Sequence, residues 1–527
     1  MSYENESDKM EGRSVSCAAD TMGMDAARTY WRECAFSIFG AVLLAHGGEF
    51  GLWIGSGIIL ALIASGFLIR ISYLWFALVA SLYPLDSVPN SIGIKEFLFV
   101  LAFTAFFVYS FANYQAQAAL TIKRYGLFIA VVATVIVINY VKAFQTGVPT
   151  SDWLRGLAPF LLIGIAFPLF LVLRGAPKLT GAVVLSGIML ALLFALRVLF
   201  VYYAEELWKP VECVYNADID RWIPLRDADP VVFAGAESFE LVRRVTMVLS
   251  QSTDVMVVIA AVCGLILCYC FDGWRRLGGI LMITVGVAAI TLTQTRSMLL
   301  TCVLLVGCLI AYHVIWFRKA SDATARLRGL AVAVAAAVLT FVSTIYCFDM
   351  NELVLGRFES LVNEGRSGDK PERAVDANVA VDANVTARLV EYKIAWKMFL
   401  ESPVFGKGLG AKHLMHIDTG FEVISREVSY VHNWIFYMLK SGGFVGFSLY
   451  LAFIIIPLYL TVRAGALGTP AGLWIFLSIG CLICYALFFA VFRLLPFNFV
   501  FGCIGGISVA HYSRIGIGRK MGGDTEL

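Results

Sequence analysis

The amino-acid sequence predicts an all-α integral membrane protein with about 12–14 transmembrane helices. Hydrophobic residues make up 59% of its 527 residues and the mean hydropathy is +0.79, whereas an ordinary soluble domain is about 45–50% apolar. Charged residues make up only 15%, against roughly 25% in soluble chains. A soluble protein could not bury so much apolar surface, but a membrane protein need not, because lipid solvates its outer surface.

Apolar runs of about 20 residues, the length that spans the hydrocarbon core as a helix, recur along most of the chain. About fourteen such runs occur, near residues 35–48, 51–69, 72–84, 95–113, 125–142, 156–173, 180–203, 253–271, 279–294, 297–317, 329–347, 432–460, 471–492 and 494–512. The first and third are short, so twelve or thirteen spans remain as alternatives. We expect a transmembrane bundle over residues 34–512, flanked by cytoplasmic tails at 1–33 and 513–527.

The Lys and Arg residues of the short loops predict the orientation, because cytoplasmic loops carry an excess of them. With residues 1–33 placed in the cytoplasm, every second short loop is basic and the alternate loops hold only isolated cations. Residues 1–33 are also too long and too acidic for the start of a cleavable signal peptide. Both termini are therefore predicted to be cytoplasmic, and two long loops, 204–252 and 348–431, to be periplasmic.

The second long loop has two recognisable parts. A hexapeptide is duplicated in tandem, Ala374–Val379 followed by Ala380–Val385, which is typical of a tolerated loop insertion. An amphipathic helix is predicted after it, on the membrane surface or against the bundle, from apolar residues at helical spacing: Leu389, Tyr392, Trp396 and Phe399. Pro403 is expected to end this helix.

The cysteines do not point to redox or metal chemistry. Most of the twelve lie inside apolar runs, where cysteine behaves as a small hydrophobe. Cys481 and Cys484 have the spacing of a redox pair but occur within an apolar helix, so packing is the favoured interpretation. Cys213 and Cys347 fall in or beside the predicted outer segments and could form a disulfide. No Gly-rich phosphate loop, zinc-type cysteine spacing or basic block suggests a nucleotide, zinc or nucleic acid.

Arg296 is the arginine whose position is least ordinary. The segment Thr293-Gln-Thr-Arg296-Ser joins two apolar helices almost without a loop. The arginine is therefore held at or just below the membrane surface, where an unpaired charge is costly. A snorkelling cation or a lipid-headgroup anchor is the alternative. The neighbouring hydroxyls, which could also meet a phosphate, favour a functional role.

Further arginines are predicted on the same outer face, and each alone would be an ordinary interface residue. They are Arg155 after Asp152 and Trp153, Arg197 in the seventh span, Arg243 and Arg244 at the end of the first long loop, and Arg388 in the second. Guanidinium groups bind phosphate in a bidentate manner and stay charged in a low-dielectric medium. Their convergence favours a lipid diphosphate at the interface, although the sequence does not decide between Arg243 and Arg244.

His432 begins the span that follows the second long loop. Histidine is the side chain suited to proton transfer near neutral pH, although an interfacial histidine that satisfies a helix end is the more common interpretation of such a residue alone. His413 and His416 lie upstream, and a metal site built from the three histidines is a minor alternative without supporting carboxylate spacing.

The context of His432 carries a resemblance to a known family. His432-Asn433, nine residues, Gly443, two residues and Gly446 resembles the His-Asn-x9-Gly-x-x-Gly signature of the O-antigen ligase and polymerase superfamily. The segment around Arg296, the stretch from Arg388 through Pro403-Val-Phe-Gly406-Lys-Gly408-Leu-Gly410, and Asp152-Trp-Leu-Arg155 resemble further elements of that superfamily. The resemblance is best over about residues 240–510.

The resemblance implies a GT-C-like, metal-independent membrane glycosyltransferase without a cofactor. It would move a glycan from undecaprenyl diphosphate to an acceptor at the periplasmic face of the bacterial inner membrane. His432 and Arg296 would be catalytic; Arg388, Arg155 and Arg244 would bind the diphosphate; Asn433 and Arg197 would support them. The implied partners are the lipid-linked donor, a lipid-linked glycan or lipid A core acceptor, membrane lipids and a chain-length regulator.

Two alternatives to a polymerase remain. The span count and the Asp152-Trp-Leu-Arg155 element favour a surface-polysaccharide polymerase, but the His-Asn signature does not distinguish it from an O-antigen ligase that uses the lipid A core. A flippase for the same lipid should carry ionisable residues near mid-membrane and repeated halves. The spans hold almost no such charge and show no obvious repeat, which favours the enzyme.

Overall fold

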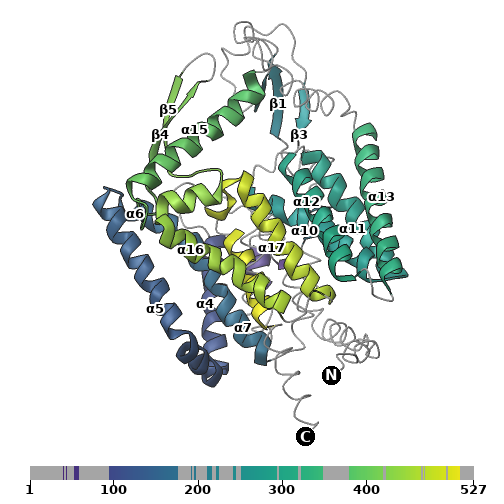
Figure 1. Cartoon of the computed structure of the whole chain (residues 1–527), viewed down its shortest axis with the longest axis horizontal. Helices are drawn as coiled ribbons and strands as arrows, with labels where there is room; N and C mark the ends of the chain where they lie inside the picture. The colour runs from purple at the N-terminus through teal and green to yellow at the C-terminus, as the bar shows by residue number, and fades with distance from the viewer. Residues whose placement is uncertain are drawn as a thin grey trace, which may run out of the picture. The chain divides into compact units, whose positions relative to one another are not determined.

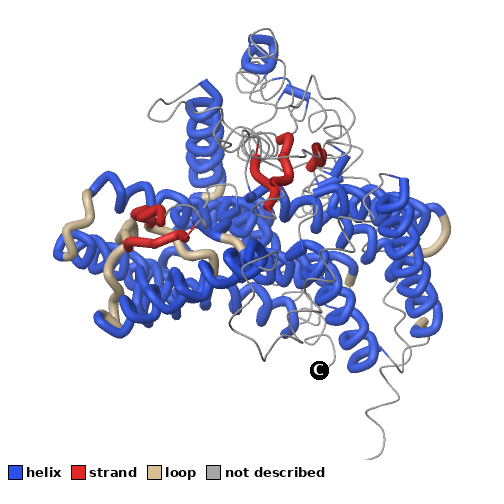
Figure 2. Tube along the Cα trace, turned by 90° about the horizontal axis from the view of Figure 1, so that it is seen from above, coloured by secondary structure: helices blue, strands red, loops and turns tan. Residues whose placement is uncertain are grey.

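The computed structural model describes residues 39–40, 43, 53–58, 94–175, 191–192, 195–196, 211–216, 221–224, 241–244, 251–293, 296–317, 322–347, 379–418, 423–463, 467, 469–493 and 497–510. Helices account for 89% of them, which confirms the all-α prediction (Figures 1 and 2). The predicted cytoplasmic tails and most of the first, second, third and seventh predicted spans lie outside the described residues.

The chain divides into two compact units. The first comprises residues 1–118, 167–189 and 516–527, and the second comprises residues 119–166 and 190–515. In the first unit, Phe111 of helix α4 (Ile94–Asn113) packs against Phe167 near the start of α7 (Ala166–Gly175), with ring centroids 5.5 Å apart. All of the predicted site residues belong to the second unit.

Helices of the second unit match the predicted spans closely. They are α5 (Gln115–Gln145, from Ala119 onward), α6 (Thr150–Leu161) with the 3-10 turn η2 (Leu162–Ile165), α10 (Gln251–Cys270), α11 (Trp274–Thr293), α12 (Arg296–Tyr312) with the π-helical turn η4 (His313–Phe317), α13 (Ala323–Cys347), α16 (Trp434–Arg463) and α17 (Pro470–Phe488) with the 3-10 turn η6 (Ala490–Arg493). A further helix covers Phe497–Ala510. Within the described part of the chain, seven helices are long and apolar enough to cross a membrane.

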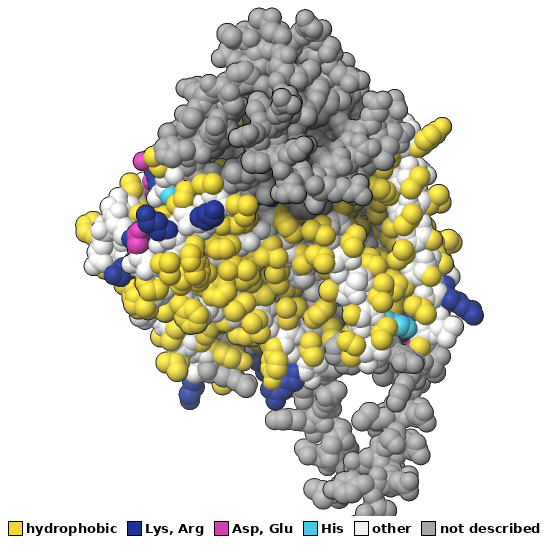
Figure 3. Space-filling model, turned by 45° about the horizontal axis from the view of Figure 1, so that its top comes forward, with side chains coloured by type: hydrophobic (Ala, Val, Ile, Leu, Met, Phe, Trp, Pro, Cys, Tyr) yellow, Lys and Arg dark blue, Asp and Glu magenta, His cyan; other side chains and the backbone are white. Residues whose placement is uncertain are grey.

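Large apolar side chains remain exposed on these helices. Leu127 of α5 is 82% exposed, and Leu339 of α13 is 69% exposed. Figure 3 shows hydrophobic side chains over much of the visible face, with Lys and Arg mainly near its borders. A soluble protein rarely exposes such large apolar areas, so these surfaces fit contact with lipid.

Strands, which the sequence analysis did not predict, occur in both long loops. In the first loop β1 (Val211–Asn216) lies between β2 (Arg221–Pro224) and β3 (Leu241–Arg244), antiparallel to both. In the second, β4 (His413–Asp418) and β5 (Val423–Val428) form an antiparallel hairpin. Cys347, at the end of α13, is a free exposed thiol, so the suggested disulfide with Cys213 is not formed. Cys481 and Cys484 are also free.

The predicted amphipathic helix is α15 (Val379–Glu401), which ends two residues before Pro403 as expected. Glu391 and Ala395 are buried, while the predicted apolar residues Leu389 and Trp396 are exposed. The helix also begins earlier than expected. The second copy of the duplicated hexapeptide is helical and forms the first turns of α15.

The helices that flank α17 run antiparallel to it. The Tyr312 hydroxyl at the end of α12 donates to the carbonyl of Leu467, just before α17, and Leu305 faces Gly480 in the middle of both helices. At 1.5 Å per residue, the nine residues back to Arg296 and the nine forward to Phe489 each cover about 13 Å. The start of α12 therefore lies level with the end of α17. We call this the site end of the second unit.

Candidate active site

A break in α16 organises the site end. Gly443 has φ 61° and ψ −163°, so the helix is interrupted there. The segment 403–408, which follows α15, fits into the break: the N–H groups of Lys407 and Gly408 donate to the carbonyls of Lys440 and Ser441, at 2.9 and 3.0 Å. In return, the N–H groups of Phe444 and Val445 donate to the carbonyls of Pro403 and Val404 at 2.8 and 3.1 Å.

These four bonds satisfy the backbone groups that the break exposes, as a membrane interior requires. The close approach needs glycine on both sides. A Cβ on Gly443 would come within 2.5 Å of the Gly406 nitrogen, and one on Gly406 within 2.5 Å of the Gly443 nitrogen. Two motifs that the sequence presented separately, His-Asn-x9-Gly and Pro-Val-Phe-Gly-Lys-Gly-Leu-Gly, are thus one packed unit.

Asn433 fixes the start of α16. Its side-chain oxygen accepts a hydrogen bond from the N–H of Ile435 at 2.9 Å, and its amide donates to the carbonyl of Leu487 in α17 at 3.2 Å. Asn433 therefore ties the start of α16 to the end of α17 beside His432. Tyr392 of α15 lies near Arg388 and Glu391. Burial of the Tyr392 hydroxyl also raises its pKa, an effect that the nearby Arg388 partly opposes.

His432 is held by a carboxylate that the sequence analysis missed. Oε2 of Glu391 lies 3.0 Å from Nδ1 of His432 and accepts a second hydrogen bond, of 2.9 Å, from the backbone N–H of His432. Glu391 is fully buried, whereas the His432 side chain is 27% exposed. A carboxylate facing Nδ1 assigns the proton to that nitrogen, which leaves the lone pair on Nε2 available as a base.

Two arginines flank this pair. Arg388 lies one helical turn before Glu391 on α15, with its guanidinium 5.7 Å from the ring centroid of Phe489. The guanidinium of Arg493, in η6, lies 4.3 Å from the ring centroid of Tyr430, whose ring meets His432 edge to face at 5.2 Å. Nε of Arg493 is buried without a hydrogen-bond partner among the described residues. Both cations can therefore accept an anionic ligand.

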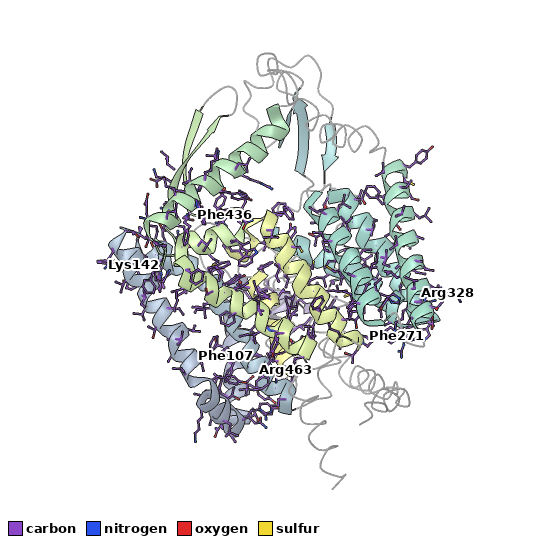
Figure 4. The ribbon with its side chains drawn as sticks, viewed as in Figure 1. Phe107, Lys142, Phe271, Arg328, Phe436 and Arg463 are labelled. Atoms are coloured by element: carbon purple, nitrogen blue, oxygen red, sulfur yellow. The ribbon has the colours of Figure 1, made fainter. Side chains whose placement is uncertain are left out.

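Aromatic contacts hold α15 over the start of α16. Tyr392 stacks on Phe436 at 4.8 Å, and Trp396 meets the same ring edge to face at 6.5 Å. Figure 4 places Phe436 beneath α15, whereas Arg463 lies at the far end of α16. This packing positions Arg388 and Glu391, which lie on the helix just before these rings.

The other predicted residues divide into two groups. Arg296 is the first residue of α12 and only two residues separate it from the end of α11, as the sequence predicted. Its backbone lies at the site end, but its side chain, like those of Arg243 and Arg244 in β3, is outside the described parts. Arg197 is also outside them. Arg155 is 73% exposed and lies 3.9 Å from Asp152, with no described contact to the His432 cluster.

The Asp152-Trp-Leu-Arg155 element has structural contacts. Asp152 forms an ion pair with Lys412 at 2.9 Å. The Trp153 indole donates to the side chain of Asn139 at 3.0 Å, and Asn139 in turn donates to the carbonyl of Ser441 at 2.8 Å. The element therefore anchors the 403–412 segment and the break in α16.

Of the three histidines suggested as a metal site, the side chain of His416 lies outside the described parts. Among the described residues no group of three metal-ligating side chains comes together. His413 is buried against Lys440, whose Nζ lies 3.0 Å from its Nδ1. Lys440 is itself fully buried. It is an ionisable residue inside a predicted span, six residues from the start of α16.

Comparison with known families bears on these motifs. Residues 280–451 match the family model described as O-Antigen ligase. The resemblance to the O-antigen ligase superfamily is confirmed. The matched region runs from α11 to the middle of α16, so it includes Arg296, Arg388, Glu391, His432 and Gly443 but not Arg493. No curated protein matches the chain.

The match, together with the apolar helices, supports an integral membrane protein of the O-antigen ligase or polymerase type in surface-polysaccharide biosynthesis. Members of this family are membrane glycosyltransferase-like enzymes. In general they work on lipid-linked glycans and a lipid A core acceptor.

Proposed function

We propose that this protein transfers a glycan from undecaprenyl diphosphate to an acceptor hydroxyl at the periplasmic face of the bacterial inner membrane, as a surface-polysaccharide polymerase. The observation that carries the proposal is the Glu391–His432 pair, with Nε2 open, between the guanidinium groups of Arg388 and Arg493. A base beside two cations is the arrangement that attack on a phosphorylated sugar requires.

The proposed step is a single displacement at the sugar carbon that bears the diphosphate. The acceptor hydroxyl forms the new glycosidic bond while Nε2 of His432 takes its proton, and the bond between the sugar carbon and the diphosphate oxygen breaks. Undecaprenyl diphosphate leaves with the electron pair of that bond. Glu391 stabilises the imidazolium that forms on His432.

The arginines stabilise the leaving diphosphate. Arg388 and Arg493 stay charged in a low-dielectric surrounding and can bind phosphate oxygens in a bidentate manner. Arg296, at the level of the same site end, is proposed to join them, with Arg244 or Arg243 of β3 and Arg155 as outer contacts to the donor. Guanidinium groups in this number can supply the charge stabilisation that a metal ion would otherwise provide, so the step is proposed to be metal-independent.

An O-antigen ligase is the second candidate, because the family match carries that description. The deciding experiment is reconstitution of the purified protein in vesicles with an undecaprenyl-diphosphate oligosaccharide, with and without a lipid A core acceptor. A product ladder without the core identifies a polymerase, and a single product that requires the core identifies a ligase. Movement of the lipid across the bilayer with no transfer in either reaction would instead identify a flippase.

Two variants test the residues in the same assay. His432→Ala and Arg296→Ala are expected to insert into the membrane normally and to lose glycan transfer. Lys397→Met is the matched control, because Lys397 is exposed on α15 and contacts none of the proposed groups. Normal transfer by both purified variants would rule out the mechanism.

A further inference from the structure

Lys440 is a lysine in the buried interior of an apolar helix, where a charged side chain is costly. It follows Leu439 in α16, immediately before the break, and its side chain is fully buried. Burying an ammonium group costs several kcal/mol unless it is compensated. Its Nζ donates to the carbonyl of Ser429 at 3.1 Å and lies 3.0 Å from Nδ1 of His413. Both partners hold the ammonium group of Lys440 in place.

His413 does not balance the charge of Lys440, because it is neutral itself. The pKa of His413 is lowered from 6.5 to about 4, first by burial and then by the positive charge of Lys440, while Glu391 acts in the opposite direction. At neutral pH, Nδ1 of His413 therefore accepts a hydrogen bond from the ammonium of Lys440. Ser429 offers only a carbonyl, so neither direct partner supplies a negative charge that would balance the Lys440 ammonium.

Glu391 is a fully buried carboxylate, and its direct partners, two N–H groups of His432, can bind it without carrying a positive charge. It accepts from the N–H and from Nδ1 of His432, and its second oxygen, Oε1, has no hydrogen-bond partner in the described part of the chain. Glu391 and Lys440 both act electrostatically on the same His413 ring. Opposite charges that are both buried compensate each other more strongly than screened surface charges would.

We propose that Lys440 is a positioning residue, held by His413 and Ser429, whose charge balances Glu391 and so keeps His432 neutral and ready to act as a base. Without Lys440, Glu391 would take its counter-charge from His432, which would bind a solvent proton at Nε2 and form an ion pair with the carboxylate. His432 would then be a base only at higher pH. The catalytic consequence rests on the proposed function; the charge network does not.

Among the described side chains, the charged and titratable groups around His432 come from several segments. They are Glu391, Arg388 and Tyr392 of α15, Tyr430 on the preceding residues with Arg493 of η6 behind it, and Lys440 and His413 deeper in the cluster. A purely structural lysine would change the stability of the protein when replaced. It would not change the pH at which His432 loses its proton.

The test measures that pH directly, without glycan transfer. Diethyl pyrocarbonate acylates unprotonated imidazole nitrogens, and peptide mass mapping reports the modification rate of each histidine. The His432 side chain is 27% exposed and should react, whereas the buried His413 should be protected. In the full-length protein in detergent, Lys440→Met should raise the pH midpoint of His432 modification by about one unit. Lys440→Arg, which keeps the charge, should shift it far less.

A double variant shows whether Lys440 acts through Glu391. In a Glu391→Gln background, Lys440→Met should cause no further shift, because no carboxylate remains to be balanced. Lys397→Met, which removes an exposed and screened charge, should leave the midpoint unchanged. An unchanged midpoint in Lys440→Met, or the same shift with and without the Glu391 carboxylate, would overturn the proposal.

Poor folding of Lys440→Met would still be informative. Removal of both buried charges leaves none uncompensated, so Glu391→Gln/Lys440→Met should accumulate in the membrane even if Lys440→Met does not. Failure of both to accumulate would also overturn the proposal. Transfer activity is then measured separately across pH. A midpoint shift in a protein without glycan transfer would refute the proposed function alone, and normal transfer with an unshifted midpoint would refute this inference alone.

Discussion

The two ends of the second unit each contain a histidine whose Nδ1 is hydrogen-bonded, yet they differ in what surrounds it. At the site end, Nδ1 of His432 faces the carboxylate of Glu391 at 3.0 Å, and the imidazole is partly exposed. At the opposite end, Nδ1 of His313 lies 3.0 Å from the hydroxyl of Tyr269, and the residue is buried.

The arginines at the two ends also differ in whether they form ion pairs. At the opposite end Arg326 bonds to Asp322 at 2.6 Å, and Arg276 pairs with Asp272, each one turn away on or beside its own helix. At the site end neither Arg388 nor Arg493 forms an ion pair with a described residue, although each, like Arg326, lies over an aromatic ring. Paired charges indicate a structural cluster, whereas cations left open beside a base indicate one that binds a ligand.

The largest expected effect is on the open arginines. Arg388→Ala and Arg493→Ala should each reduce transfer from the lipid-diphosphate donor by about 10²–10³-fold, because each removes charge stabilisation of the leaving group. Arg326→Ala, at the opposite end, should lower the melting temperature and leave transfer nearly unchanged. Initial rates in reconstituted vesicles measure the comparison. Equal loss of transfer in all three variants would mean that the two ends do not differ in function.

The next largest effect is expected at the hydrogen-bond partners of the two histidines: replacing Glu391 should slow transfer, whereas replacing Tyr269 should change only stability. Glu391→Gln should slow transfer by about 10²-fold, since the amide no longer stabilises the imidazolium of His432. Tyr269→Phe removes the hydroxyl that faces His313 while keeping the ring, so it should cost about 1 kcal/mol of stability and no transfer rate. Rates and melting curves of the two variants give the answer. Unimpaired transfer by Glu391→Gln would separate the carboxylate from catalysis.

Hydropathy predicted the described helices well because lipid imposes one simple requirement, a long apolar run, at each crossing. The sequence also pointed to His432 and Arg388, which stand out as polar residues at predicted boundaries. Glu391 was missed because it lies within a periodic stretch whose apolar residues drew attention, although it follows Arg388 by one turn. Lys440 was missed inside an apolar run, where an ionisable residue should itself have been the signal.

Arg493 could not be found from the sequence, because its short loop gives no hint that it folds back onto Tyr430. The same is true of the break in α16. Hydropathy runs smoothly through Gly443, and the segment that fills the break lies more than thirty residues earlier in the chain. Contacts between distant segments are set by packing, which local patterns do not encode.

The two glycines of the His-Asn-x9-Gly-x-x-Gly signature should differ in how much their replacement lowers the stability of the protein. Gly443→Ala places a side chain at φ 61° against the backbone of Gly406 and Val404, so we expect a loss of about 3 kcal/mol in stability from strain and overlap together. Gly446 is helical, and a Cβ added there would meet no neighbouring segment within 4 Å, so Gly446→Ala should be neutral or slightly stabilising. Thermal unfolding in detergent separates them; equal stability would contradict the role of the break.

The smallest expected effect is the pH dependence that His413 adds at the site end. Its pKa is lowered from 6.5 to about 4 in the folded protein by burial and by Lys440. The unfolded chain therefore binds a proton at this residue as the pH falls below 6.5, while the folded chain does not until about pH 4. Stability is lost across that window, by about 1 kcal/mol at pH 5.5 relative to pH 7.5. His413→Gln should flatten this part of the curve of unfolding free energy against pH. Parallel curves for the two proteins would show that His413 titrates in the folded protein as it does in the unfolded chain, and that Lys440 does not act on it.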